Sequence, residues 1–166
     1  MMCFRKLGFV GLVLFLSLNH ALAEDWKGSP DSREYRLGVM TGFGFVNSSV
    51  GPPLIGTASK KIVDHGFISS INNSVSLEAF LGPVFLSNTT ALAYSLHMRW
   101  DFEKDDDWTL YGLAGLGGDY YSNRSSNNLN VSLRLGVGAF WKMSSAVHGR
   151  VELSHNLIGV GVSFPF

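Results

Sequence analysis

Leu157-Ile-Gly-Val-Gly-Val-Ser-Phe-Pro-Phe166 is the stretch of sequence that decides the fold. Every second residue is large and apolar, and the residues between them are mostly small. The apolar set is Ile158, Val160, Val162, Phe164 and Phe166. A period of two is typical of a β-strand, whose successive side chains point to opposite faces. The small face suits a crowded, curved interior, and a terminal aromatic ring suits the place where a strand meets a membrane interface.

The same stretch resembles the C-terminal targeting strand of bacterial outer-membrane β-barrel proteins. The resemblance is carried by Gly161, Phe164 and Phe166, which match the glycine, the aromatic residue three positions later and the terminal aromatic residue of that family. This chain departs from the pattern at Gly159, where the family has a polar residue, and at Pro165, which has no N–H to donate to a ladder. The resemblance implies an outer-membrane location. It also implies partners in biogenesis, namely the barrel assembly machinery and periplasmic chaperones.

The same alternation recurs through the chain and predicts about eight strands. It is clearest between residues 92 and 102, where Leu, Tyr, Leu, Met, Trp and Phe alternate with Ala, Ser, His, Arg and Asp. Further strands are predicted at 35–45, 74–82, 129–142, 147–154 and 157–166. Polar or Gly- and Pro-rich stretches predict connections at 47–57, 69–73, 87–90, 103–107, 119–128, 144–146 and 155–156. Two questions stay open: whether 58–68 is a strand or a loop, and which face of 108–117 is apolar.

Residues 1–23 have the pattern of a cleaved secretory signal peptide. Arg5 and Lys6 precede an apolar run from Leu7 to Leu18, and Ala21-Leu22-Ala23 offers a small-residue cleavage site. The run is shorter than the roughly 20 residues that a membrane-spanning helix needs. We therefore expect two segments, the signal peptide at 1–23 and an outer-membrane β-barrel at 24–166.

Composition narrows the possible functions of the mature chain. The only cysteine of the sequence, Cys3, falls in the predicted signal peptide. The mature chain is therefore expected to have no disulfides and no thiol-based sites. From Glu24 onward, 11 Lys and Arg face 13 Asp and Glu, a net charge of −2. This balance leaves no basic footprint for nucleic acid. No apolar run after the signal is long enough for a helical membrane protein.

The charges on the polar faces favour a membrane barrel over a soluble β-sandwich, which is the alternative for alternating strands. A narrow lumen must hold charges that neutralise one another, whereas the wet face of a sandwich tolerates any charge. Eight strands leave an interior just wide enough for side chains. We predict a charge network in the lumen formed by Arg36, Glu78, Arg99, Asp101, Arg134, Lys142, Arg150 and Glu152.

The aromatic residues and the chain order predict how the barrel lies in the membrane. Tyr35, Trp100, Phe102, Trp141 and Phe166 fall at strand ends, where an aromatic belt would lie. An even number of strands places both ends of the barrel on the periplasmic side. The connections at 47–57, 87–90, 119–128 and 155–156 would then face outward.

Three groups of residues are candidates for chemistry. Glu152, Ser154 and His155 contain the residue types of a nucleophilic triad, but Ser154 and His155 point to opposite faces of a strand. Lipid A deacylase barrels carry His-x-Ser-Asn, and here Glu152 stands where their base would be. His97 and His148 lack the spacing of a metal pair, and the Asp105–Asp107 run lacks the glycine and distal glutamate of a calcium loop.

We therefore expect an all-β, antiparallel up-and-down transmembrane β-barrel of about eight strands in the bacterial outer membrane. Its expected role is structural or surface-interacting, without catalysis, metal or cofactor. The alternatives are a narrow anion-preferring pore, since five lumenal cations face three anions, and a lipid A modifying hydrolase. Expected partners are outer-membrane lipid and the biogenesis factors, with no nucleic acid, and the chain is expected to be a monomer.

Overall fold

The computed structural model describes residues 26, 28–29, 31–123 and 126–166. Within these residues the chain forms strands joined by turns and loops, and it contains no helix long and apolar enough to cross a membrane. The strands are β1 (Tyr35–Val46), β2 (Ser49–Gly51), β3 (Ile55–Val63), β4 (Asn73–Phe85), β5 (Thr90–Glu103), β6 (Trp108–Asn123), β7 (Ser126–Lys142), β8 (His148–Ser154) and β9 (Leu157–Pro165).

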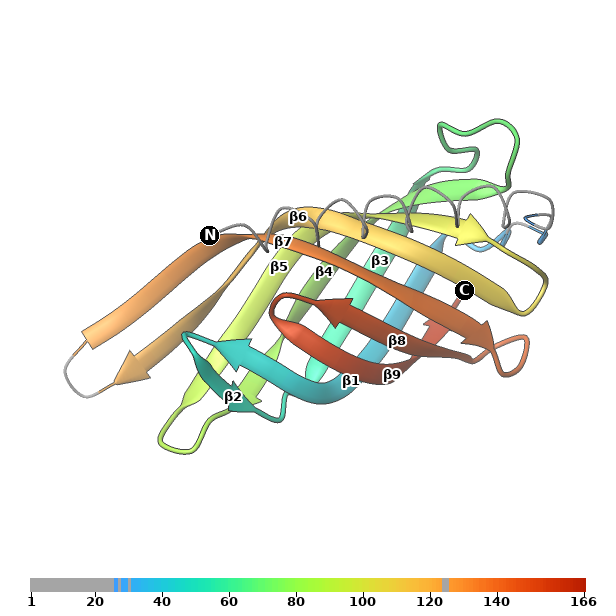
Figure 1. Ribbon diagram of the computed structural model, residues 1–166. Helices are drawn as coiled ribbons and strands as arrows, with labels where there is room; N and C mark the ends of the chain where they lie inside the picture. Colours follow the sequence, from blue (N-terminus) through green and yellow to red (C-terminus); the bar gives the residue numbers. More distant parts are fainter. Residues whose placement is uncertain (1–25, 27, 30, 124–125) are drawn as a thin grey trace, which may run out of the picture.

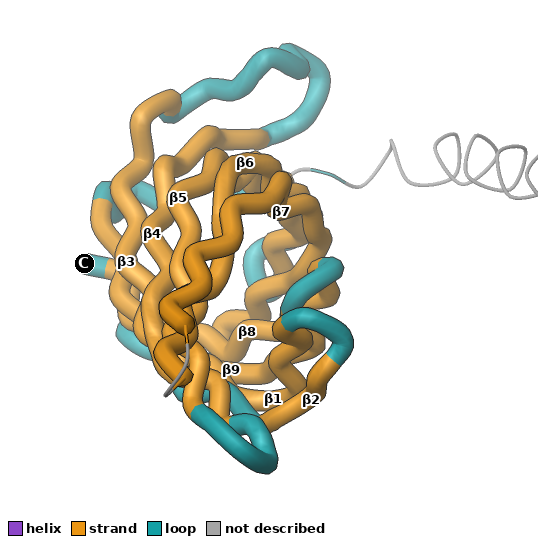
Figure 2. The backbone as a smooth tube through the Cα atoms, turned by 90° about the vertical axis from the view of Figure 1, so that its left-hand side faces the viewer, coloured by secondary structure: helices purple, strands orange, loops and turns teal. Residues whose placement is uncertain are grey.

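The sheet closes on itself as an eight-stranded barrel (Figures 1 and 2). β2 and β3 both pair with β1, and they form one strand that is interrupted at Pro52-Pro53. From β3 to β9 each strand pairs antiparallel with the next, and β1 pairs with β9 from Arg36↔Pro165 to Gly44↔Leu157. The predicted fold class, an all-β antiparallel up-and-down barrel, is therefore confirmed. Closure leaves no sheet edge along the β1–β9 seam, which a strand in hydrocarbon requires.

Inward and outward faces alternate as the sequence predicts. On β5, Ser95, His97 and Arg99 are buried in the lumen, whereas Leu96 and Met98 are about half exposed on the outer wall. On β9 the predicted apolar face also points outward, and Leu157 and Ser163 are buried. An outer wall of exposed Leu, Val, Ile and Phe surrounds a filled interior, the reverse of a soluble barrel.

The prediction of a loop at 119–128 was wrong. β6 and β7 continue as one long hairpin, paired from Trp108↔Trp141 to Asn123↔Ser126. The sequence is polar there because the hairpin extends beyond the apolar band, where polar side chains suit both faces of a strand. The predicted loop at 47–57 was likewise too long. The turn is confined to Asn47-Ser48, and β2 starts at Ser49. Both turn residues have positive φ (46° and 66°), as a two-residue hairpin requires.

The structure also settles the two open stretches. Within 58–68, β3 continues to Val63 and a loop follows. On β6, Tyr111 and Leu113 are buried in the lumen, and Leu110 and Leu116 lie on the outward face. The alternation was hidden because an inward tyrosine and leucine interleave with outward Gly112 and Ala114.

Aromatic residues form a girdle at the end of the barrel where Tyr35 and Phe166 stack, 5.9 Å between ring centroids. Trp108 and Trp141 form a cross-strand pair 6.1 Å apart at the same end. Exposed Phe45, Phe85 and Tyr120 lie near the opposite ends of their strands and form a second girdle. At ~3.3 Å per residue and a tilt of about 40°, the 10 residue steps from Tyr35 to Phe45 rise roughly 25 Å, the height of the apolar band of membrane barrels.

The segment before β1 lies against one end of the barrel. Trp26 packs edge-on against Phe102, and Asn72 Nδ2 donates to the Gly28 carbonyl at 2.7 Å. The predicted signal peptide at 1–23 lies outside the described residues. Of the predicted domain at 24–166, the strands occupy Tyr35 to Pro165.

Candidate functional site

The barrel has two ends, which we name by what they carry. The termini end holds Tyr35, Phe166 and the turns at 104–107 and 143–147, and the hairpin end holds the turns at 47–48 and 155–156, the loop at 86–89 and the tip of the β6–β7 hairpin (Figure 1). Between them the lumen is filled by two layers of side chains, one charged and one apolar.

Glu78 of β4 is at the centre of the charged layer and is 1% exposed. Arg150 of β8 reaches it from across the lumen with two N–H groups, Nη2 to Oε1 at 2.6 Å and Nη1 to Oε2 at 3.0 Å. Arg99 of β5 also pairs with Glu78. It donates two hydrogen bonds to Asp101, from Nε to Oδ1 at 2.7 Å and from Nη2 to Oδ2 at 2.9 Å. His97 Nε2 lies 3.1 Å from the same carboxylate.

A second carboxylate, Glu152 of β8, joins the other cations. It pairs with Arg134 of β7, which is fully buried, and accepts from Arg150 Nη2 at 2.8 Å. The Tyr111 hydroxyl accepts from Arg150 Nε at 2.9 Å and lies 3.2 Å from Glu152. Strands on opposite sides of the barrel are thereby linked through the lumen by charged groups.

The charged layer is electrically balanced. Three guanidinium groups, of Arg99, Arg134 and Arg150, face three carboxylates, of Glu78, Asp101 and Glu152, and all six residues are 4% exposed or less. Burying a charge is costly unless it is paired and hydrogen-bonded. The pairing makes the layer neutral as a unit, with no surplus charge to attract an ion.

Small residues on the inward face of the wall make room for these side chains. A Cβ at Gly138 would collide with the Tyr111 ring, and a Cβ at Gly115 would collide with His97. Both glycines face the lumen in strands that carry large inward residues at neighbouring positions. The inward glycines of β6 and β7 therefore leave the space that neighbouring large side chains such as Tyr111 and His97 occupy.

Arg36 and Lys142 were predicted in the same network, and the structure separates them from it. Arg36 pairs with Asp31 at 3.2 Å and lies over the Phe140 ring at 4.1 Å, near the termini end. Lys142 is exposed at the last position of β7, and the structure gives it no ion pair within the described residues. By strand register Lys142 shares the inward face of β7 with Phe140. Because it is the last residue of the strand, its side chain lies at the mouth of the barrel and is exposed.

Asp31 fastens the segment before β1 across the termini end of the lumen. Its carboxylate accepts from Arg33 Nε at 2.7 Å and from Arg36 Nη2 at 3.2 Å, and Lys61 Nζ donates to its carbonyl. Burial raises the pKa of Asp31, but the hydrogen bonds from Arg33 and the charges of Arg36 and Arg33 outweigh it and hold the pKa below its usual range.

An apolar layer, absent from the sequence prediction, fills the lumen on the side of the hairpin end. It is a cluster of buried residues: Met40, Val46, Ile55, Phe80, Val84, Ala91, Ala93 and Leu157. The Phe80 ring separates the two layers, since the Arg134 guanidinium lies over it at 3.8 Å. Large apolar residues on the otherwise polar faces, such as Met40, Phe80 and Leu157, were the signal for this layer.

A cavity of about 350 Å³ lies above the apolar layer at the hairpin end. Its floor contains Ile55, Phe80 and Val84, and its polar rim consists of Asn47, Asp119, Asn130, Ser132, His155 and Asn156. Asn130 Nδ2 donates to Asn47 Oδ1 and lies equally close to Asp119 Oδ2, both at 3.1 Å.

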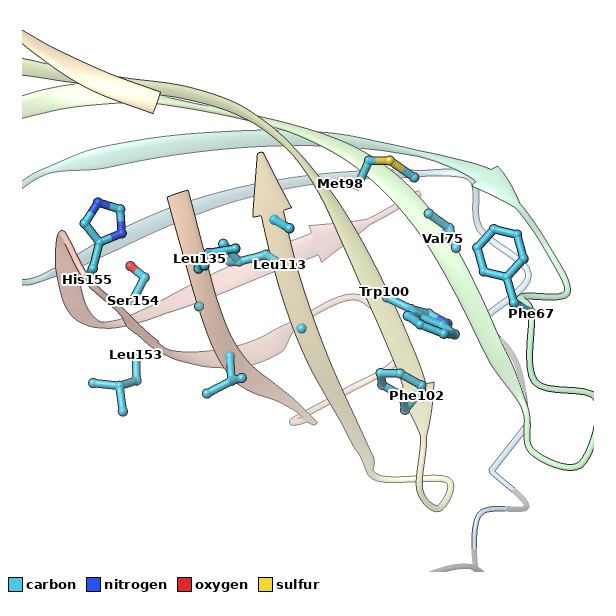
Figure 3. A pocket seen from close by; sticks show the side chains of 14 residues that line it. Phe67, Val75, Met98, Trp100, Phe102, Leu113, Leu135, Leu153, Ser154 and His155 are labelled. Carbon is cyan, nitrogen blue, oxygen red and sulfur yellow. The ribbon is translucent and has the colours of Figure 1, made fainter. Parts of the chain in front are cut away.

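The outer wall carries an apolar groove of about 760 Å³ that runs over β5 to β8 (Figure 3). Met98, Trp100, Phe102, Leu135 and Leu153 line it, and Ser154 and His155 lie at its far end (Figure 3). Ser154 is buried and its Oγ lies 3.2 Å from Glu152 and 3.0 Å from Asn156, whereas His155 is exposed in the turn. The described contacts give Ser154 no hydrogen bond to His155.

These features were compared with known proteins. No family model matches the sequence, and no curated protein matches it. Solved structures do match. The N-terminal β-barrel domain of Pseudomonas aeruginosa OprF superposes with a TM-score of 0.60 at 16% identity, over 81% of this chain and 98% of that one. The fold is that of a transmembrane β-barrel.

Two further structures support the same fold. Ail, the attachment invasion locus protein of Yersinia pestis, matches with a TM-score of 0.54 at 14% identity over 80% of this chain and 97% of that one. Ail has also been crystallised with the heparin analogue sucrose octasulfate. A transmembrane β-barrel designed de novo matches with a TM-score of 0.52 at 13% identity over 82% and 98% of the two chains.

The three residues of the predicted targeting strand lie in β9 and just beyond it. Gly161 pairs with Met40 in the closing seam, Phe164 points outward and Phe166 stacks on Tyr35. Their role in targeting stays a prediction. His97 and His148 both face the lumen but from different strands, and the described residues contain no cluster of three His, Cys, Asp or Glu that could hold a metal ion.

Proposed function

We propose that the protein is an outer-membrane barrel with a closed lumen and no catalytic activity, which presents its hairpin end outside the cell as a contact surface. The observation that carries this proposal is the contrast between the two parts of the molecule. The lumen is filled by a neutral charged layer and an apolar layer, while β6 and β7 extend past the neighbouring β8–β9 hairpin (Figure 1).

The described residues of the hairpin end carry little charge, which indicates what kind of partner suits them. Among the described residues of its turns, loop and hairpin, Asp119 is the one carboxylate and His155 the one imidazole, and no Lys or Arg is present. A sulfated polymer needs clustered cations, so the described part of this surface favours an uncharged polar partner instead. Ail is named the attachment invasion locus protein, and a surface-contact role for this chain is in keeping with that name.

The test is adhesion of cells that display the full-length chain. Replacing residues 121–128 by an Asn-Gly turn shortens the β6–β7 hairpin and leaves the β6–β7 pairs from Trp108 to Tyr120. We expect the shortened variant to migrate as a heat-modifiable barrel on gels and to lose most adhesion to an epithelial monolayer. A matched variant with loop residues 87–89 replaced by Gly and Ser should adhere as the wild type does.

Unchanged adhesion of the shortened variant would contradict the contact role. Protease shaving of intact cells tests the orientation separately. Cleavage at residues 104–107 with none in the hairpin tip would place the termini end outside and contradict the proposed topology.

A narrow pore that prefers anions is the second candidate from the sequence, although Arg36 is paired with Asp31 and the charged layer is neutral. Planar-bilayer recordings decide it. The filled lumen predicts no steady current steps from purified protein, and stable anion-selective steps would replace the contact role with a pore.

Lipid A hydrolysis is tested by mass loss from lipid A, which Ser154→Ala would abolish if this residue were a nucleophile.

A further inference from the structure

We propose that the barrel wall is open at the hairpin end between β7 and the β8–β9 turn, and that the cavity behind this notch binds the apolar chain of an uncharged amphiphile. The site is independent of the contact role proposed above. It is built from a missing strand pairing, a cavity with an apolar floor, and a polar rim.

The notch arises because β7 is much longer than β8. β7 has 17 residues, of which the 7 from Gly136 to Lys142 pair with β8, so 10 residues from Ser126 to Leu135 have no β8 partner. His155 N donates to the Leu135 carbonyl at 3.4 Å, and beyond this contact the described strands leave that edge of β7 unpaired. Figure 1 shows the β6–β7 hairpin continuing past the β8–β9 hairpin.

Part of this open edge lies at the depth of the apolar band. Val131, Leu133 and Leu135 point outward and are 51–65% exposed, like the lipid-facing residues elsewhere on the wall. Tyr120, a girdle residue, pairs with Leu129, which places residues 131–135 on the membrane side of the girdle. Unpaired backbone N–H and C=O groups in hydrocarbon cost several kcal/mol each, so this edge needs polar partners.

The cavity reaches from the lumen to this edge. Phe80, Val84 and Ile55 belong to the lumenal apolar layer, whereas Phe45 and Val131 are on the outward face, and all five line the same cavity. Its volume of about 350 Å³ is within the range of small-molecule sites. Among the described contacts, the side chain of Asn130 of β7 donates a hydrogen bond to Asn47 of the β1–β2 turn across the notch.

The lining specifies the ligand class. An apolar floor that is continuous with the outer wall suits an alkyl chain that arrives from the neighbouring leaflet. The rim offers amides, a hydroxyl, an imidazole and one carboxylate, Asp119, which suits hydroxyl or amide head groups and repels an anionic one. Such a head group can also supply hydrogen bonds to the open edge of β7.

The experiment uses the full-length folded barrel in phosphatidylcholine nanodiscs with a decyl glucoside that carries a diazirine at the end of its chain. After irradiation, mass spectrometry maps the labelled residues. We expect label on the inward residues Phe80, Val84 or Ile55, removed by excess unlabelled decyl glucoside and much less by decyl sulfate. Label confined to outward residues such as Leu96 and Leu133 would overturn the proposal.

Two variants fill the site from different sides. Ala93→Phe fills the floor and Ser132→Phe fills the rim, and either should reduce the inward label by at least about tenfold, the effect of excluding two or more buried methylene groups. Ala114→Phe on the outward face of β6 is the matched control and should leave the inward label unchanged. Heat-modifiable migration shows that each variant is folded.

Unchanged inward label in both filling variants, provided they migrate as folded barrels, would contradict the site. Because adhesion is not measured, failure here leaves the contact role standing, and failure of adhesion leaves this site standing.

Discussion

Single residues hold the lumen together because each carries several contacts at once. Arg150 donates to Glu78, Glu152 and Tyr111, so three strands on different sides of the barrel converge on one guanidinium. Removing one partner of a buried ion pair leaves the others without compensation, which costs more than the pair itself contributes. Arg150 is therefore the residue whose loss we expect the barrel to tolerate least.

Arg150→Met tests this expectation. The variant keeps the apolar volume of the stem but leaves Glu78 and Glu152 with one cation fewer, which should lower the free energy of unfolding by about 3–5 kcal/mol. Urea unfolding of the barrel in lipid vesicles measures the loss. Lys142→Met is the control, since Lys142 is exposed, and a change of at most ~0.5 kcal/mol is expected. Equal effects of the two substitutions would show that the charged layer does not stabilise the fold.

Gly42 is a second residue with a specific requirement. Its φ of +143° is one that L-residues rarely adopt, and a Cβ there would collide with the Ile158 carbonyl across the β1–β9 seam. Gly42→Ala should destabilise the barrel by about 1–3 kcal/mol. Gly56→Ala places the same methyl group 3.7 Å from the nearest atom and should be neutral or stabilising by up to ~1 kcal/mol. The two midpoints in urea compare them directly, and coincident midpoints would contradict the role of Gly42.

At the scale of elements, alternation predicted most strands but not their ends. Between residues 92 and 102 every polar residue points inward as expected, because one face meets hydrocarbon and the other meets a packed lumen. Above the apolar band the outward face needs no apolar residue, and the signal disappears although the β6–β7 hairpin continues. The sequence also did not predict which face of β6 points inward. On most other strands the larger apolar residues point outward, whereas on β6 the large Tyr111 and Leu113 point inward.

The segment before β1 is an element that the sequence did not predict. Asp31 ties it to the barrel, and its pKa is depressed in the folded state. A depressed carboxylate contributes stability that is fully present above its unfolded pKa of about 4 and is lost as the pH falls through the lower folded pKa. This contact should therefore weaken under acid and not under base.

Asp31→Asn should release the segment at neutral pH. The Arg33 N–H donates to Asp31 Oδ1 at 3.1 Å, so its amide should lose protection from hydrogen exchange in the variant, and the wild type should lose it at acid pH. Protection factors correct for the intrinsic effect of pH on exchange. Asp64→Asn, at an exposed carboxylate that pairs with the same Lys61 at 3.4 Å, should leave the Arg33 amide unchanged. Retained protection in Asp31→Asn would contradict the tie.

At the scale of the whole molecule, the two aromatic girdles define where the bilayer lies. On β7, Trp141 belongs to one girdle and Leu129 pairs with Tyr120 of the other, so Leu135 lies midway. The charge network follows from the inward pattern of polar residues. The apolar layer was missed because Met40, Phe80 and Leu157 were judged by their strand face rather than by their height in the barrel.

An arginine scan along β7 locates the bilayer. Leu135→Arg should cost about 2–4 kcal/mol of folding free energy and Leu129→Arg only ~0–1 kcal/mol, because the cost of a lipid-facing cation falls from the midplane to the interface. Folding into vesicles measures both. Both side chains are more than half exposed on the same strand, so they differ in depth alone. Equal costs would contradict the assigned position of the membrane.

The contact between Tyr35 and Phe166 means that the ring of strands has no privileged starting point. The two residues exchange backbone hydrogen bonds of 3.1 and 2.9 Å, so a short peptide could join them and new ends could be cut in the loop at 86–89. Such a circular permutant would keep every strand neighbour while moving Phe166 into the interior of the chain. It should refold spontaneously in vesicles, and its fate in living cells would separate what the shape requires from what delivery to the membrane requires.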